Sequence, residues 1–168
     1  NYEGDAVSLS ELDIHINTLI QSILSWESYI PAGNKTTQLL RFQGGYNFSN
    51  DGSFINSFNV GGTSEFLSKQ FLFSGINEYE IITNALISGA WGLQYHIGSN
   101  VYATGLMNAL AYDFSLDKLP QATYNRNIVL GTSLSLGYLS LLGPIELTFS
   151  YSPQTDAIIG YVNLGWSF

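Results

Sequence analysis

The sequence has no cysteine and little charge. Only 11% of its 168 residues are Asp, Glu, Lys or Arg, compared with roughly 25% in ordinary soluble domains. Without cysteine, no disulfide and no thiolate metal site can form. The 5 basic residues against 13 acidic residues give a net charge of −8, which argues against a nucleic-acid partner because phosphate binding needs a basic face.

Long apolar runs are missing as well. Residues 81–112 and 127–145 carry no Asp, Glu, Lys or Arg and are long enough for a membrane-spanning helix. Polar residues nevertheless interrupt them: in Tyr79–Ile97, Glu80 and Ser88 stand at even positions while the odd positions are mostly apolar. A helix would distribute the polar groups around its circumference, whereas a strand places them on one face. The alternation therefore predicts strands.

What the chain does contain is a series of alternating segments rich in aromatic residues, which make up 14% of the sequence. Several are long enough for a tilted strand to cross a membrane. We predict an all-β fold class, with residues 1–168 as a single domain that forms a transmembrane antiparallel meander β-barrel of about eight strands. The predicted strands are residues 12–26, 39–48, 54–62, 79–97, 101–114, 127–142, 145–152 and 158–168.

The predicted connections alternate between long and short. Short periplasmic turns and longer extracellular loops are typical of outer-membrane barrels, so an even number of strands would place both termini in the periplasm. Lys35, Lys69, Lys118 and Arg126 would lie in or beside the outer loops, where they either contact lipopolysaccharide phosphates or remain solvated. The long connections are residues 27–36, 63–77 and 115–126, the tight turns are 49–52, 98–100 and 142–144, and the last connection, 152–157, is of medium length.

The last predicted strand ends on an aromatic residue. Apolar side chains alternate with small or polar ones up to the terminus, at Val162, Leu164, Trp166 and Phe168. This pattern resembles the carboxy-terminal signal by which bacterial outer-membrane barrels are recognised for insertion, which implies the barrel assembly machinery as a partner. Trp166 and Phe168 would join the periplasmic aromatic girdle. The alternative is an edge strand of a soluble sandwich that ends in Phe168.

A narrower resemblance lies in residues 58–76. Gly61-Gly62 followed by Phe73-Ser74-Gly75-Ile76 resembles the BamA-like outer-membrane superfamily, in which a strand ends in Gly-Gly and a long loop carries an (Ile/Val)-Arg-Gly-(Phe/Tyr) motif. Ser74 stands where that family usually has arginine. Five predicted strands follow the loop here, as in the family. The resemblance implies that the chain supplies the last eight strands of a sixteen-stranded barrel and is part of a longer protein.

The variant motif is most similar to the barrels appended to bacterial patatin-like proteins. This resemblance implies an upstream lipase domain with a Ser-Asp dyad, and a barrel that anchors it or forms a conduit without enzyme activity of its own. The partners it implies are outer-membrane lipids and lipopolysaccharide, with other outer-membrane subunits or a second copy of the chain as further options.

No residue cluster predicts catalysis, a cofactor or a metal. Residues 131–135, Gly-Thr-Ser-Leu-Ser, come nearest to a Gly-x-Ser-x-Gly elbow but lie within a predicted strand. Asp51-Gly52 fits a hairpin turn better than a catalytic motif. Two alternatives stay open: a barrel phospholipase that uses His15 or His96, and a small closed eight-stranded barrel that acts as a pore or adhesin.

Overall fold

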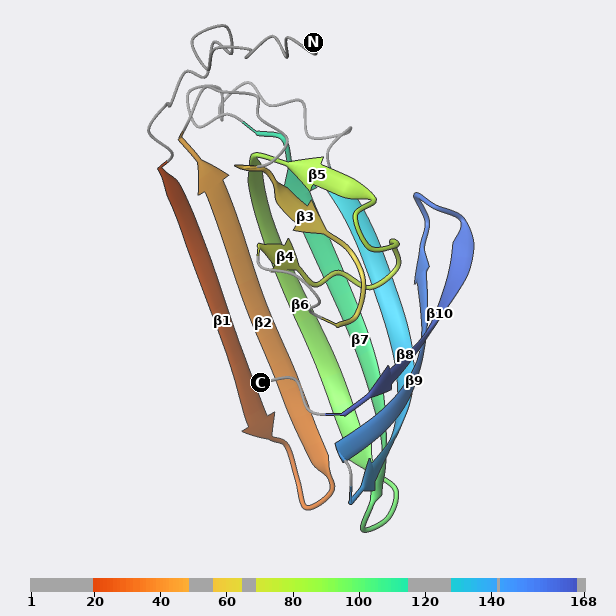
Figure 1. Cartoon of the computed structure of the whole chain (residues 1–168). Helices are drawn as coiled ribbons and strands as arrows, with labels where there is room; N and C mark the ends of the chain where they lie inside the picture. Colours follow the sequence, from red (N-terminus) through yellow and green to blue (C-terminus); the bar gives the residue numbers. More distant parts are fainter. Residues whose placement is uncertain (1–19, 49–55, 65–68, 115–127, 142, 166–168) are drawn as a thin grey trace, which may run out of the picture.

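The computed structural model describes residues 20–48, 56–64, 69–114, 128–141 and 143–165. These residues form two β-sheets and contain no α-helix (Figure 1). No helix in these ranges is long and apolar enough to cross a membrane.

The large sheet has seven strands in the order β1-β2-β6-β7-β8-β9-β10. Every pair of neighbours is antiparallel, which confirms the predicted antiparallel meander. The strands have 8 to 13 residues, a length that suits tilted membrane strands. Their bounds are β1 Gln21–Pro31, β2 Thr36–Asn47, β6 Ala85–His96, β7 Val101–Tyr112, β8 Ile128–Ser140, β9 Gly143–Ser152 and β10 Ala157–Leu164.

The period-two pattern of the sequence fixes the two faces of this sheet. Trp91 of β6 lies opposite Leu40 and Met107, which places all three side chains on one face. Ser88, three positions before Trp91 in β6, lies opposite Gln43. Both side chains point to the other face and are buried. We call the face that carries Trp91 the outer face and the face that carries Ser88 the inner face.

Large apolar side chains remain exposed on the outer face. A soluble monomer rarely exposes an apolar patch of this extent, whereas the hydrocarbon of a bilayer covers it without cost. This finding favours the membrane barrel over the soluble sandwich. The exposed outer-face residues include Ile87, Trp91, Leu93, Tyr95, Met107, Leu130, Leu134, Leu136, Phe149, Val162 and Leu164.

The connections differ at the two ends of the large sheet. Connections of two to four residues join β1 to β2, β6 to β7 and β8 to β9 at one end, at the bottom of Figure 1. At the opposite end, β2 and β6 are separated by 37 residues of sequence and β7 and β8 by 15, whereas the β9–β10 turn, 153–156, is short. The predicted long loop at 27–36 is wrong, because most of it belongs to β1. Lys35 therefore lies in a tight turn and not beside a long loop. Lys118, Arg126 and the predicted turn at 49–52 fall outside the described residues.

The predicted strand at 54–62 is also wrong as a membrane strand. Only Phe58–Val60, β3, is extended there, and it belongs to a second sheet of three strands. Gly61 and Gly62 follow with positive φ angles of 129° and 80°, and this left-handed backbone ends the strand after three residues. β3 pairs in parallel with β4, Gln70–Phe71, and antiparallel with β5, Ile81–Thr83.

The predicted strand at 79–97 is divided between the two sheets. β5 ends at Thr83 and β6 begins at Ala85. The Thr83 hydroxyl accepts from the Ala85 amide and donates to the Ala85 carbonyl oxygen, so it bends the chain at Asn84. The predicted tight turn at 98–100 is confirmed. A tight connection also joins β8 to β9, but Gly143 and Pro144, predicted as part of that turn, already belong to β9.

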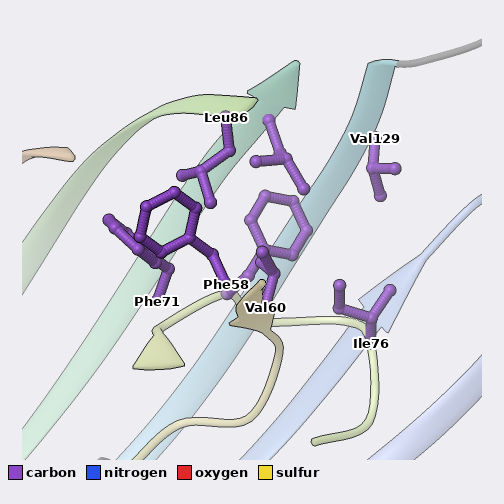
Figure 2. Close-up of a cluster of buried hydrophobic side chains, with 8 residues drawn as sticks. Phe58, Val60, Phe71, Ile76, Leu86 and Val129 are labelled. Carbon is purple, nitrogen blue, oxygen red and sulfur yellow. The ribbon is translucent and has the colours of Figure 1, made fainter. Parts of the chain in front are cut away.

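The small sheet packs on the inner face of the large one. We call residues 56–64 and 69–83 the plug. Its apolar side chains meet those of β6, β7 and β8 in one buried cluster, in which the Phe58 and Phe71 rings pack edge to face with centroids 5.4 Å apart (Figure 2). The cluster comprises Phe58, Val60, Phe71, Phe73, Ile76, Leu86, Leu110 and Val129.

Candidate functional site

The predicted loop motif lies in the plug, and the plug brings its two halves together. The Gly62 amide donates to the Ile76 carbonyl oxygen at 3.2 Å, and the Phe73 amide donates to the Gly62 carbonyl oxygen at 3.1 Å. The Gly-Gly pair and the Phe-Ser-Gly-Ile segment are thus neighbours in space, although ten residues separate them along the chain. All six predicted residues are buried.

A buried glutamine supports the turn at the Gly-Gly pair. The Gln70 side-chain amide donates to the carbonyl oxygens of Gly61 at 3.0 Å and Ser64 at 3.1 Å. A side chain at Gly61 would overlap the Asn77 carbonyl group, so only glycine fits there. The plug therefore has an internal frame of its own.

Ser74 contacts the wall through its backbone. When the Asn108 amide is oriented to satisfy both partners, its nitrogen donates to the Gly131 carbonyl oxygen at 2.6 Å and its oxygen accepts from the Ser74 amide at 2.7 Å. The Ser74 carbonyl oxygen occupies the space beside the Gly131 Cα atom. The Asn108 side chain of β7 and the space left by Gly131 of β8 together form a seat for the loop motif.

Gly75 lies against β9. Its φ angle is 102°, and a Cβ atom there would lie 2.6 Å from the Tyr151 carbonyl oxygen and 2.9 Å from the Ser152 Cβ atom. Both the backbone conformation and the close approach require glycine. The glycine of the loop motif is thus explained by contact with the wall.

Side chains near and on β10 reach the plug from the other side. The Tyr161 hydroxyl donates to the Ile76 carbonyl oxygen at 3.1 Å, and the Thr155 hydroxyl donates to the Gly75 carbonyl oxygen at 3.1 Å. The Asn163 amide donates to the Thr63 hydroxyl at 3.3 Å. These three bonds join residues 80 or more positions apart.

The opposite end of the plug rests on β2. A Cβ atom at Gly45 would lie 3.0 Å from both the Phe58 and the Phe71 rings, so the rings pack directly on the β2 backbone. Asn47 donates to the Asn56 carbonyl oxygen at 3.5 Å and to the Asn84 side chain at 3.4 Å. The plug consequently spans the inner face from β2 to β10.

Sequence reasoning missed the wall residues of this seat. Gly45 and Gly131 carried a usable signal, since both are glycines at inward positions of long strands, where a missing side chain leaves room for another backbone. Asn108 and Tyr161 carried none, because an inward polar residue is common to every position of a barrel lumen.

The residues weighed above as alternatives for catalysis do not come together among the described residues. The stretch 131–135 runs within β8, and Ser135 shares a hydrogen bond of 2.8 Å with Thr148, so it forms no elbow. His96 ends β6, with its ring centroid 6.2 Å from that of Tyr102. His15 lies outside the described residues. Within the described ranges no group of three His, Cys, Asp or Glu side chains could hold a metal ion.

The comparison with protein families decides the membership. A family model described as the OMP85 superfamily matches residues 22–168. The chain belongs to the OMP85 superfamily. This confirms the resemblance to BamA-like proteins at the level of the superfamily and makes the chain an outer-membrane β-barrel domain. A search of curated proteins finds no match.

β10 carries the first half of the predicted insertion signal. Val162 and Leu164 point to the outer face and are 66% and 72% exposed, while Tyr161 and Asn163 point inward to the plug. The side chains of β10 thus alternate between the two faces as far as Leu164. Trp166 and Phe168 lie outside the described residues, and recognition by the assembly machinery stays a prediction.

Proposed function

We propose that this chain is the plugged part of a wide outer-membrane barrel that anchors a patatin-like phospholipase domain, or forms a conduit for it. The observation that carries the proposal is the plug seated on the inner face. In an eight-stranded barrel the interior is just wide enough for the side chains of the strands themselves. Here Phe58, Phe71 and Phe73 of the plug are buried between the wall and the lumen, so a wider barrel is needed to hold them.

The directions of the edge strands support completion by further strands. Seven antiparallel strands leave β1 and β10 running parallel to each other. An all-antiparallel barrel needs an odd number of additional strands between them. A second copy related by a two-fold axis along the barrel would also place β10 beside β1 in parallel. The parity therefore favours strands from elsewhere on the same polypeptide over a homodimeric barrel.

The inner face of β1 supports the same conclusion. Ile23 and Tyr29 point inward by their register with Gly45 and Leu39, yet they are 54% and 60% exposed. Among the described residues β1 and β10 each have one neighbouring strand. An unpaired strand edge costs several kcal/mol per unsatisfied group in hydrocarbon. Additional wall must cover both edges in the membrane.

The end with tight turns would face the periplasm. β10 ends there, so the carboxy terminus would be periplasmic, next to the assembly machinery that reads Val162, Leu164, Trp166 and Phe168. β1 begins at the opposite end. A periplasmic amino terminus then requires one more crossing before β1. The outer face would contact lipid, and loops at the long end would contact lipopolysaccharide.

The patatin-like assignment rests on the variant motif, with Ser74 where most relatives would have arginine. Ser74 is held through its backbone amide and its carbonyl oxygen, and neither contact depends on the side chain at this position. Lipase chemistry would reside in a domain outside this chain. That the chain has no enzyme activity of its own stays a prediction.

Phospholipid hydrolysis tests this assignment. The refolded chain in phospholipid vesicles should release no fatty acid above a protein-free blank, whereas the full polypeptide that carries it should release fatty acid. Hydrolysis by the chain alone that is lost in His96→Ala or His15→Ala would establish the barrel-phospholipase alternative. A full polypeptide that is also silent would contradict the patatin-like assignment and leave the barrel itself unaffected.

A further inference from the structure

A polar chamber lies beneath the plug, toward the end with the tight turns. Its volume is about 280 Å³. Five plug residues, Gly62, Thr63, Leu72, Phe73 and Ser74, form part of its lining, and the rest comes from the inner faces of β1, β2 and β6–β9. Any solute that enters the barrel from the tight-turn end meets this chamber before it meets the plug.

One wall of the chamber holds a neutralised cation. The Arg41 Nε atom of β2 lies 2.7 Å from the Glu27 Oε2 atom of β1, directly across the strand pair. The Tyr29 hydroxyl also donates to the Glu27 carboxylate. The guanidinium charge is therefore compensated within its own wall.

The opposite wall holds an uncompensated carboxylate. Glu146 of β9 lines the chamber and accepts long hydrogen bonds from the hydroxyls of Tyr102, at 3.4 Å, and Thr148, at 3.3 Å. Lys35, Arg41 and Lys69 are the Lys and Arg residues of the described ranges, and none of them forms an ion pair with Glu146.

The Glu146 carboxylate points to the lumen side of β9. Tyr102 of β7 can reach Glu146 because its ring lies flat over Gly137 of β8, where any side chain would overlap the ring. Two neutral hydroxyls and an aromatic ring thus surround the charge. None of these groups cancels it.

We infer that Glu146 makes the chamber selective for small cations over anions. Low-dielectric walls focus the field of a single charge into an aqueous cleft, and carboxylates in a pore favour cation passage. This inference rests on the conduit form of the proposed function, since selectivity has meaning only if ions pass.

Reversal potentials in planar bilayers test the inference, with K⁺ and Cl⁻ as the probes across a KCl gradient. The full polypeptide that carries this chain should show a reversal potential on the K⁺ side. In Glu146→Gln, which keeps the hydrogen-bond acceptor and removes the charge, that potential should shift toward zero. Arg41→Gln should shift it the other way, because Glu27 is then uncompensated. Asp156→Asn, in the β9–β10 turn outside the chamber lining, removes the same charge and should change nothing.

The outcomes distinguish failure of the Glu146 selectivity from failure of the conduit itself. Conductance with the same reversal potential in Glu146→Gln and the parent protein would overturn the inference and leave the conduit intact. A shift of equal size in Asp156→Asn would also overturn it, because net charge and not the chamber would then set selectivity. A folded, inserted protein without any conductance would overturn the conduit and the inference together.

Discussion

The carbonyl oxygen of Ser74 lies in the space that a side chain at Gly131 would occupy. The loop motif is thus held by the shape of the wall as well as by hydrogen bonds. The seat joins a segment between β2 and β6 to strands β7 and β8, so the plug cannot move without losing contacts on several strands.

Gly131→Ala should displace the plug. The new methyl group would overlap Ser74 and approach Phe73, and overpacking of this kind costs about 1–3 kcal/mol. The measurement is the urea midpoint for unfolding of the full polypeptide that carries this chain, refolded in lipid and monitored by the different gel mobilities of its folded and unfolded forms. Gly105→Ala is the matched control, because nothing lies within 4 Å of a Cβ atom at that position. Equal midpoints for the two variants would contradict the seat.

Asn108→Ala should weaken the same seat by a different route. It removes the partner of the Ser74 amide and of the Gly131 carbonyl oxygen, and a buried polar group left unpaired costs about 1–3 kcal/mol. The amide exchange rate at Ser74 should rise along with the loss of stability. Asn34→Ala, in the exposed β1–β2 turn, should alter neither quantity. Unchanged exchange at Ser74 would show that Asn108 does not hold it.

Phe58→Ala should create a cavity between the plug and the wall. Phe58 is fully buried, and Phe→Ala substitutions in packed cores cost about 3–5 kcal/mol. Phe149→Ala, on the lipid-facing side of β9, leaves no internal cavity and should cost less. Unfolding in the same lipid compares the two. A larger loss for Phe149 would mean that the outer face is the packed one.

The alternation that predicted β6, β7 and β8 is a local property, since each residue faces lipid or lumen according to its own parity. The same local rule produced the error at 54–62. Phe58 and Val60 alternate with Asn59 just as a lipid-facing strand would, yet their apolar face is covered by Leu86 of the wall. Lipid and a packed wall both require an apolar side chain, so the two-residue alternation of the sequence cannot distinguish a lipid-facing strand from a strand packed on the wall.

The candidate site was predictable only in part, for a related reason. Gly61, Gly62 and the segment 73–76 were recognisable as a motif within one continuous stretch of sequence. Asn108 and Gly131 acquire their roles from contacts made across the barrel wall. Nothing in the residues beside them indicates which loop they will meet.

Phe168→Asp should impair insertion far more than Ser167→Asp. Val162 and Leu164 point to the lipid side, and the alternation of the sequence predicts the same face for Phe168 and the other face for Ser167. The measurement is the fraction of protein that acquires the folded, protease-resistant form in outer membranes. Equal fractions for the two variants would remove the terminal aromatic residue from the insertion signal.

Cross-linking of the plug to the wall tests the central claim most directly, and the absence of native cysteine makes it clean. Thr63→Cys with Asn163→Cys places two thiols at side chains that are in contact. Thr63→Cys with Val162→Cys is the control, because Thr63 lies on the inner side of β10 and Val162 points to its outer face. With a short bis-maleimide reagent and protein inserted in outer membranes, the account predicts cross-linking of the first pair and not of the second. Failure of the first pair, or equal cross-linking of both, would contradict a plug seated inside the barrel.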